Sequence, residues 1–504
     1  MDHSSVRVYP FPDGEAVYPS YDVTANGVNV PLHMARVSTY PVNTRWPGHQ
    51  RPKSETELCP FASMAADGAV AFDVTADRDF RAVQVKPLSK GVTAEACGRR
   101  VRFTVPGPGF YTLELDGYHN ALHIFIDPMT DYGVDPGDPD VLYYGRGVHD
   151  VGLIELHSGQ TLYLEEGAVV YARIVAKDAD HIRILGHGIL DGSRNVETIL
   201  CEVGEQHREE IEKHFAINNA IREHTVQLEY CRDVRIDGIT LRDSLVYCIR
   251  PICCKDVEIG CVKLIGNWRY NSDGIDMHNC ENVHIHDCFL RTFDDSICIK
   301  GFDYTQNEAD MYHNGVDYSD FRHVLVERCV IWNDWGRALE IGAETRAKEI
   351  CDITFRDCDL LRTTHIACDV QNVDYADVHH ITFDDIRVEL DPVSQQPIHI
   401  GLNADTYAED PNSTYMPMLL CSNVTYIEEY SRDREHRGVN RDILYRNIAV
   451  TAPKMPLSHF RGWDAEHTSR EVTVENLTLN GVRVTDPETA RFTTGPDTPM
   501  PRLI

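Results

Sequence analysis

The sequence has no apolar run long enough to cross a membrane, because no window approaches the roughly 18 uncharged apolar residues that a span needs. Its first residues, MDHSSVRVYPFPDGEAVYP, carry neither the basic nor the apolar segment of a secretory signal. Basic residues are scarce, since 48 Lys and Arg face 79 Asp and Glu and give a formal charge of −31. We therefore expect neither a membrane nor nucleic acid as partner, and a cytoplasmic location in which the 16 cysteines stay reduced.

Two further patterns are missing. Neither CxxC nor a His and Cys spacing typical of zinc sites occurs, so we predict no metal and no cofactor. The apolar residues also do not follow a helical period from about residue 230 onward, where they recur at offsets 0, 2, 5 and 7. The copies of this spacing start at Val234, Val257, Val283, Val324, Ile353, Ile381, Ile443 and Val472, with a partial copy at Ile182.

The spacing describes short strands joined by tight turns. Offsets 0 and 2 are the inward side of one strand, because side chains alternate with period two. The odd step to offset 5 requires a turn, after which offsets 5 and 7 form the inward side of the next strand. Units of this kind stack as a parallel β-helix, in which each coil buries its apolar side on its neighbours. The cysteines at offset 5 (Cys288, Cys329, Cys358) and offset −3 (Cys231, Cys254, Cys280) are therefore predicted to be interior.

The N-terminal quarter of the chain has a different pattern. Short runs such as VAFDVTA, RVRFTV and FYTLELD are separated by Gly, Pro and Asp, as in an antiparallel β-sandwich. We predict an all-β chain with a β-sandwich at 1–126, a linker at 127–140 and a parallel β-helix at 141–504.

The string TFDD occurs twice, and its place in the repeat separates the two copies. Asp384 and Asp385 fall at offsets 3 and 4, so we predict a solvated turn. Asp294 and Asp295 follow the repeated block and directly precede another strand, SICIK, while Asp273 of NSDGID lies at a similar stage one coil earlier. Because coils stack about 4.8 Å apart, three carboxylates should converge on one outer face, and their crowding should raise the pKa of one of them.

These motifs resemble those of a known family. NSDGID, followed one coil later by DDSICIKG, is similar to the Asn-Thr-Asp-Gly and Asp-Asp motifs of polygalacturonase-like family 28 glycoside hydrolases. DSLVYCIRPICCKDVEI (243–259) resembles the family's Ser-Pro-x-Trp segment, and GHGILDG (186–192) its early glycine-rich coil. The resemblance covers roughly residues 140–400 and implies a right-handed β-helix that hydrolyses glycosides with inversion. It implies that Asp294 is the general acid and that Asp273 and Asp295 hold and deprotonate the attacking water.

Two motifs of that family are missing. Its catalytic Gly-His-Gly should fall in DWGRALEIGAE (334–344), where Arg337 stands at about the place of the histidine. The Gly-His-Gly around His187 lies in the first coil, and we predict that His187 is core. The family's Arg-x-Lys clamp for a galacturonate carboxylate has no counterpart in THIACDVQN (364–372), so a uronic acid would lose its strongest partner.

The related dextranase and isopullulanase family also lacks both motifs, keeps the three aspartates and has an N-terminal β-sandwich. Residues 143–172 resemble its domain junction. We therefore expect a neutral oligosaccharide substrate, although the spacing from Asp273 to Asp294 fits family 28 better and an exo-polygalacturonase-type uronidase stays open. A polysaccharide lyase would need a basic cluster that the sequence lacks, and a non-catalytic carbohydrate-binding β-helix is a further alternative.

Other residues beside the motifs are candidates for substrate binding. They are Asn271, Lys300, Arg337, Trp335, Tyr270, Trp268, Glu340 and Asp276. The aromatic rings would either stack on sugars or pack internally, and the two cations would either bind substrate or neutralise the carboxylates. Insertions at 205–224 (a predicted helix), 303–321 and 391–441 would close one end of a cleft, which favours exo action on short, α-linked oligosaccharides. A homo-oligomer is compatible with the sequence.

Overall fold

The computed structural model describes residues 5–39, 56–194, 224–302, 320–390, 416–428 and 430–504. Between these ranges it describes the backbone of four short strands, β28 (Tyr312–His313), β29 (Val316–Asp317), β36 (Ile398–His399) and β37 (Tyr407–Ala408). Within these residues the only helical element is a 3₁₀ turn, η2 (Leu88–Lys90), and no helix could span a bilayer. The helix predicted at 205–224 falls, except for its last residue, outside the described residues.

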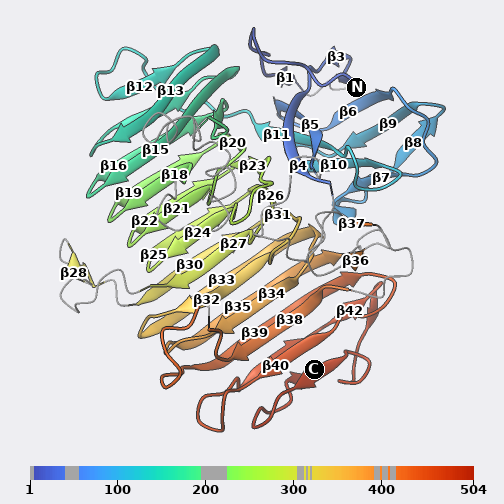
Figure 1. Cartoon of the computed structure of the whole chain (residues 1–504). Coiled ribbons are helices and arrows are strands. Elements are labelled where there is room, and N and C mark those ends of the chain that lie inside the picture. The colour runs from blue at the N-terminus through green and yellow to red at the C-terminus, as the bar shows by residue number, and fades with distance from the viewer. Residues whose placement is uncertain are drawn as a thin grey trace.

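Two sheets precede the long solenoid, and Figure 1 shows them in blue beside it. The larger contains β1 (Val6–Val8), β4 (His33–Ser38), β5 (Thr56–Ala66), β7 (Val83–Lys86), β10 (Gly109–Leu115) and β11 (Leu122–Pro128). The smaller contains β2 (Tyr21–Ala25), β3 (Val28–Asn29), β6 (Val70–Ala76), β8 (Ala94–Cys97) and β9 (Arg100–Val105). Residues of both sheets, such as Phe103 and Leu113, share one core. The prediction of purely antiparallel pairing is wrong for β11, which lies parallel to β5, because side-chain alternation does not encode strand direction.

The described residues from 141 onward form a parallel β-helix, as predicted, with three ladders of strands that we call the first, second and third ladders. The first contains β12 (Val141–Tyr144), β14 (Thr161–Leu164), β16 (Asp180–Gly186), β19 (Arg232–Asp237), β22 (Lys255–Gly260), β25 (Glu281–His286), β30 (Phe321–Glu327), β33 (Glu349–Arg362), β35 (Asp377–Glu389), β39 (Val439–Thr451), β41 (Val472–Glu475) and β45 (Arg502–Leu503).

The second ladder follows the first within each coil, and the third completes the coil. The second contains β13 (Gly147–Leu156), β15 (Ala168–Lys177), β17 (Ile189–Asp191), β20 (Thr240–Arg242), β23 (Lys263–Ile265), β26 (Phe289–Thr292), β31 (Val330–Asn333), the later halves of β33, β35 and β39, and β42 (Thr478–Leu479), to which β43 (Val482–Arg483) adds antiparallel. The third contains β18 (Val226–Glu229), β21 (Ile249–Ile252), β24 (Ile275–His278), β27 (Ile297–Gly301), β32 (Leu339–Thr345), β34 (Ile366–Asn372), β38 (Met418–Val424), β40 (Ser458–Arg461) and β44 (Phe492–Thr494).

The turn predicted between offsets 2 and 5 has one geometry in eight coils. The residue at offset 4 is left-handed in each, at Gly238, Cys261, Asp287, Arg328, Asp357, Asp385, Asn447 and Asn476. A single left-handed residue bends the chain sharply, and Gly, Asn and Asp tolerate this conformation best. Asp385 has a φ of 55° and pairs with Arg387, while Asp384 pairs with Arg446, so the second TFDD is the surface turn that the sequence predicts.

The solenoid interior holds the residues that the repeat assigns to it. Both predicted cysteine ladders are fully buried in the main hydrophobic core. His187, predicted to lie there as well, does not: register pairs Ile189 with Thr240, so this turn has one extra residue and His187 points outward. Its Nδ1 lies 3.1 Å from Asp127 Oδ2, and its ring stacks on Tyr9. His187 is thus buried between the N-terminal sheets and the solenoid.

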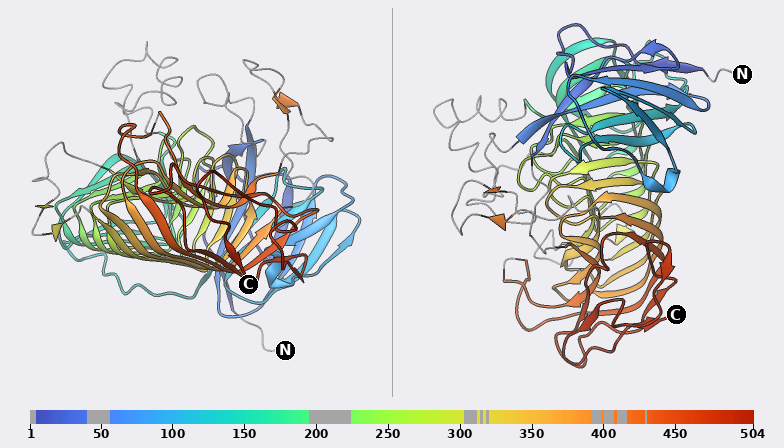
Figure 2. Two further views of the ribbon diagram at one scale, coloured as in Figure 1. Left: turned by 90° about the horizontal axis from the view of Figure 1, so that it is seen from below. Right: turned by 90° about the vertical axis from the view of Figure 1, so that its right-hand side faces the viewer.

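The N-terminal sheets cover the outer face of the second ladder, and Figure 2 shows them along one flank of the solenoid. Phe61 and Phe125 of the sheets share a cluster with Phe289 and Trp332 of the ladder. Several buried cations of the second ladder also pair with acids across or beside this contact, namely Arg242 with Glu15, Lys263 with Asp127, Arg291 with Asp334 and Arg362 with Glu114. The N-terminal sheets therefore occupy the outer face of the second ladder.

Candidate active site

The three aspartates lie in the loops that lead from the second to the third ladder. Asp273 comes just before β24, and Asp294 and Asp295 lie between β26 and β27. The loops stack directly, because the Gly274 N–H donates to Asp295 O at 2.9 Å and the Asp294 N–H to Ser272 O at 3.4 Å. Carboxylate oxygens of Asp273 and of Asp295 each lie within 4.8 Å of the same Cys298 Sγ. The convergence predicted from the repeat is therefore present.

Two glycines make this stacking sterically feasible. A Cβ at Gly274 would lie 2.3 Å from Ser296 O, and one at Gly336 would lie 2.6 Å from both the backbone and the Oδ1 of Asp295. Contacts this short are repulsive, so neither position accepts a side chain without displacing the aspartate loops. The glycines of NSDGID and DWGR thus let one coil approach the next at the carboxylates.

Hydrogen bonds fix the backbone of Asp294, and the residue is buried. Thr292 Oγ1 and Asn333 Nδ2 donate to its carbonyl oxygen at 2.8 and 2.6 Å, and the Asp295 N–H donates to its Oδ1 at 3.0 Å. Burial, together with the negative charge of Asp295, raises the pKa of Asp294 to about 8. Its carboxyl group is therefore protonated near neutrality and available as an acid.

Asp295 has the opposite character. Its Oδ1 accepts the Arg337 N–H at 2.7 Å, and Arg337 Nη1 lies 3.6 Å from its Oδ2. Burial opposes ionisation, but Arg337 and a hydrogen bond from Glu340 outweigh it and hold the pKa of Asp295 below its ordinary value. Arg337 Nε also lies 2.8 Å from Asp369 Oδ2 and 3.4 Å from Glu340 Oε1. Of its two predicted roles, the neutralisation of carboxylates is therefore the one observed.

Lys300 neutralises carboxylates of the preceding coil in the same way. Its Nζ lies 2.8 Å from Asp276 Oδ2 and 3.5 Å from Asp273 Oδ2. Burial and the neighbouring Asp294 raise the pKa of Asp273 well above its ordinary value, whereas Lys300 and His278 outweigh burial at Asp276 and lower its pKa. Asp273 therefore carries a proton or shares one with a neighbouring carboxyl group. Asp276 stays ionised beside Lys300.

Sequence analysis missed three further residues of this cluster. Cys298, Asp369 and His278 are fully buried and face the site from β27, β34 and β24. Register places Asp276, Cys298, Glu340 and Asp369 side by side in the third ladder. A signal existed for Asp369, because it and Glu340 both stand at offset 16 of their coils. The local string THIACDVQN gives no other hint of it.

The predicted aromatic residues lie near the loops that carry the three aspartates. Trp335 stacks on Phe293, the residue before Asp294, with centroids 5.6 Å apart, and meets Tyr270 edge-on at 5.7 Å. Trp268 lies under the Arg269 guanidinium at 4.6 Å. Asn271 takes a left-handed φ of 58° in the bend that leads to Asp273. Trp335 is half-buried, whereas Tyr270 is buried.

Two groups in the cluster have the composition of a metal site. They are Asp273 with Asp276 and Cys298, and Asp295 with Cys298 and Glu340, each with ligand atoms within 4.8 Å of one another. Their charges, however, are already balanced by Lys300 and Arg337. We therefore derive no catalytic step through a metal.

Comparisons with known proteins identify the class. Residues 153–427, more than half of the chain, match the family described as Glycosyl hydrolases family 28. The chain belongs to this family and is a glycoside hydrolase, which decides against the lyase and the non-catalytic binding protein. A stretch of 125 residues is 30% identical to a probable polygalacturonase of Vitis vinifera and spans 24% of the chain and 24% of that relative. The chain thus covers only about a quarter of this curated relative.

A solved structure shares the fold. Dex49A from Penicillium minioluteum is 13% identical with a TM-score of 0.63, and the match covers 99% of this chain and 96% of that one. An exopolygalacturonase from Thermotoga maritima is 17% identical with a TM-score of 0.48, over 68% of this chain and 84% of that one. The first of these likenesses supports a β-helix preceded by N-terminal sheets across the full described length.

Proposed function

We propose that the chain is an inverting glycoside hydrolase in which Asp294 protonates the leaving oxygen and Asp295 deprotonates the attacking water. The observation that carries the proposal is the opposite shift of two adjacent carboxyls: the pKa of Asp294 is raised to about 8 and that of Asp295 is lowered. An acid and a base held in different protonation states at one pH are what single-displacement hydrolysis requires. Asp273, with its raised pKa, holds the water by hydrogen bonding.

The substrate is proposed to be a neutral sugar at the reacting position. Six carboxyl groups (Asp273, Asp276, Asp294, Asp295, Glu340, Asp369) and two cations form the cluster, and both cations already contact carboxylates. Because Lys300 and Arg337 already contact carboxylates, neither is free to pair with a uronate carboxylate, which would meet the acids of the cluster. The uronidase alternative rests on the partial identity to a probable polygalacturonase.

Exo action on short α-linked oligosaccharides is proposed from the placement of the three insertions in the repeat alone. Most of 205–224, 303–321 and 391–415 lies outside the described residues.

One experiment tests these proposals together. Aryl glycosides and short oligosaccharides, neutral and uronic, are incubated with the full chain, and the product anomer is followed by NMR from the first turnovers. We expect a neutral substrate, release of sugars from one chain end, and a product of inverted configuration. Retention of configuration contradicts the assignment of Asp295 as base, and exclusive action on uronides contradicts the charge argument.

The pH profile is a second expected result. Because Asp294 must be protonated to act, kcat/KM falls about tenfold per pH unit above pH 8. The acidic limb lies below the ordinary carboxyl pKa of about 3.9, because the pKa of Asp295 is lowered. The cation of Lys300 favours ionised Asp294, so Lys300→Met moves the alkaline limb to higher pH. A downward shift in this variant contradicts the assignment.

A further inference from the structure

A second cluster of chemically active side chains lies on the first ladder, away from the carboxylates of the third ladder. Cys351 on β33 and His379 on β35 are direct partners across neighbouring strands, and Glu349 stands on the same side of β33 as Cys351. The Cys351 Sγ, a ring nitrogen of His379 and a carboxylate oxygen of Glu349 all lie within 4.8 Å of one another. The intervening residue Ile350 points into the main core, so these side chains project outward from rigid strands.

Cys351 differs from the thiols of the two interior cysteine ladders. Those of the cysteine ladders, such as Cys329 and Cys358, donate to backbone carbonyls at 3.4 and 3.3 Å inside the solenoid. Cys351 is only 5% exposed, yet no group among the described residues forms a hydrogen bond with its Sγ. A buried thiol that faces an imidazole and a carboxylate, with no hydrogen bond of its own among the described residues, is available as a ligand.

The histidine is oriented as metal ligands commonly are. His379 Nε2 lies 3.2 Å from Glu349 Oε1, and its Nδ1 contacts His380 Nδ1, whose Nε2 lies 3.2 Å from Asp442 Oδ2. A ligating imidazole usually has its second nitrogen fixed in this way by a hydrogen-bond partner that is itself anchored. Arg322 lies 3.9 Å from the other oxygen of Glu349, which leaves Oε1 for the cluster.

We propose that Glu349, Cys351 and His379 bind a borderline-soft divalent cation, with Zn²⁺ as the best match. Thiolate, imidazole and carboxylate are the ligands that Zn²⁺ takes, and three of them leave a fourth, solvent-facing position. Binding releases the thiol proton to solvent and ties two successive coils together. No zinc spacing is visible in the sequence, because the cysteine and the histidine come from consecutive coils and meet only when those coils stack.

The test uses the full chain, stripped with a chelator and titrated with Zn²⁺ by calorimetry and with Co²⁺ by absorbance. We expect one Zn²⁺ per chain with a thiolate-to-Co²⁺ charge-transfer band. Cys351→Ser abolishes the band and lowers the affinity by more than about 100-fold, whereas His380→Ala, which removes only an outer partner, lowers it about 10–100-fold. Zn²⁺ also raises the melting temperature of the wild type and not that of Cys351→Ser.

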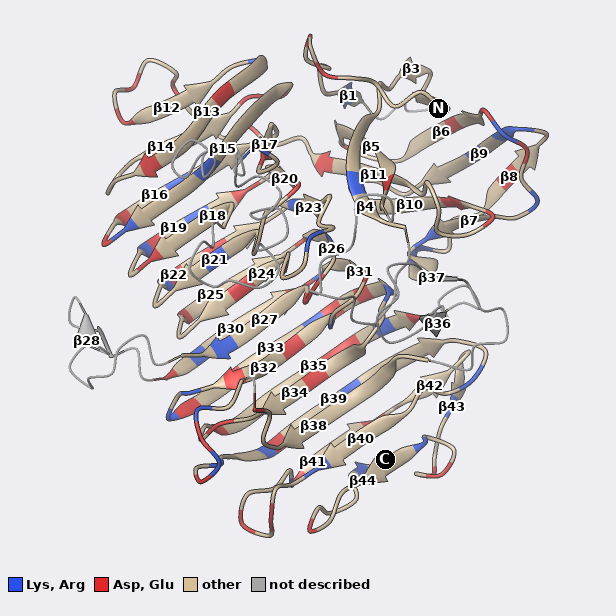
Figure 3. Cartoon of the chain, viewed as in Figure 1, with Lys and Arg blue, Asp and Glu red and all other residues tan. Residues whose placement is uncertain are grey.

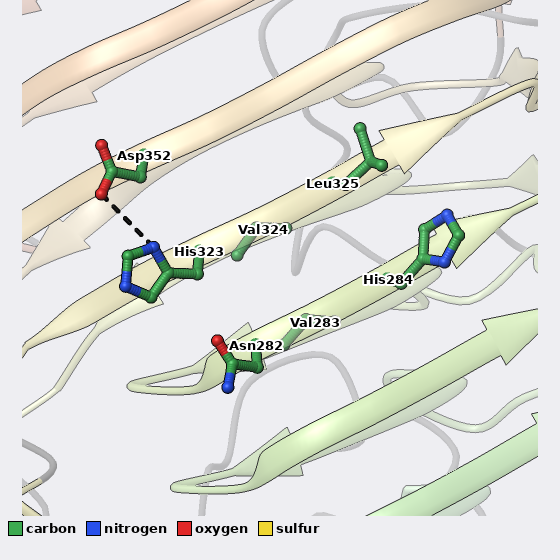
Figure 4. Close-up of a pocket in the computed structure, with 7 residues that line it drawn as sticks. All are labelled: Asn282, Val283, His284, His323, Val324, Leu325 and Asp352. Carbon is green, nitrogen blue, oxygen red and sulfur yellow. Dashed lines mark ion pairs between the residues drawn. The ribbon is translucent and has the colours of Figure 1, made fainter.

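Two matched controls make the outcome decisive. His323 pairs with Asp352 at 3.3 Å, as Figure 4 shows. Both residues line an open depression of about 440 Å³. His323→Gln should therefore bind Zn²⁺ like the wild type. Cys298→Ser should do the same, because Cys298 belongs to the carboxylate cluster. Undiminished affinity in Cys351→Ser, or loss of the Co²⁺ band in Cys298→Ser instead, overturns the proposal.

Discussion

We expect Asp294→Asn to lower kcat by about 10²–10⁴-fold while KM changes little, because an amide cannot give a proton to the leaving oxygen. Asparagine has the same shape, and its side-chain oxygen can still accept the Asp295 N–H that now lies 3.0 Å from Asp294 Oδ1. The backbone bonds from Thr292 and Asn333 to residue 294 are unaffected by the change. Steady-state kinetics on the substrate found by the glycoside screen measure the effect.

The second TFDD supplies a control within the same molecule. Asp385→Asn changes the same residue type in the same tetrapeptide, but at a surface turn where, within the described part of the chain, Asp385 forms an ion pair with Arg387. Asparagine tolerates the left-handed φ of 55°, so this variant should fold and keep its full rate. Equal losses in the two variants would mean that Asp294 acts through charge or folding and not as an acid.

The leaving group separates the acid from the base. An aryl glycoside with a strongly acidic phenol departs without a proton, so Asp294→Asn should lose far less activity on it than on an oligosaccharide. Asp295→Asn should lose about as much on both substrates, because water must be deprotonated in either case. If both variants respond alike to the leaving group, the roles assigned to Asp294 and Asp295 are wrong.

The solenoid could be predicted because its physical rules are local. Strand alternation fixes offsets 0 and 2, one left-handed residue fixes the turn at offset 4, and stacking repeats both coil after coil. His187 shows the limit, since a single extra residue in its turn reversed the side to which it points. The parallel pairing of β5 with β11 shows another, because it joins strands that lie far apart in the chain without a sequence signal.

The candidate site was predictable to the extent that it follows the repeat. Asp273, Asp294 and Asp295 come together because their loops sit at equivalent stages of successive coils. The pairing of cations with these carboxylates was not predictable, because it depends on which side chains of neighbouring coils come into contact. Lys300 pairs with Asp276, and Arg337 pairs with both Asp295 and Asp369. Figure 3 shows both signs of charge spread along the solenoid strands, so charge type alone does not mark the site.

The contact between the N-terminal sheets and the second ladder leads to the largest expected effect on stability. Lys263 and Asp127 are almost completely buried, and Lys263 Nζ lies 2.9 Å from both carboxylate oxygens of Asp127. Lys263→Met removes the cation and leaves a buried carboxylate whose remaining side-chain partners, among the residues that the structure describes, are Tyr9 and His187. Breaking a buried pair in this way costs about 3–5 kcal/mol of unfolding free energy, measured by urea denaturation.

A double variant separates lost charge pairing from lost packing. Lys263→Met with Asp127→Leu removes both charges and should regain most of the loss, because two apolar side chains need no partner. Arg446→Met, which breaks a pair at the solvent-exposed turn with Asp384, should cost no more than about 1 kcal/mol. A double variant as unstable as Lys263→Met would mean that the methionine itself fits poorly against the N-terminal sheets.

The pH dependence of the stability lost in Lys263→Met tests whether the loss is electrostatic. In the wild type, burial disfavours the Asp127 anion, but Lys263 and His187 outweigh burial and hold the pKa of Asp127 below its ordinary value. The pair therefore stabilises the fold above the unfolded carboxyl pKa of about 3.9 and loses this contribution as the pH falls. Without Lys263 the pKa of Asp127 rises, so the variant takes up a proton there and its deficit is smaller at pH 4 than at pH 7. A deficit of the same size at both pH values would assign the loss to packing and not to the unpaired charge.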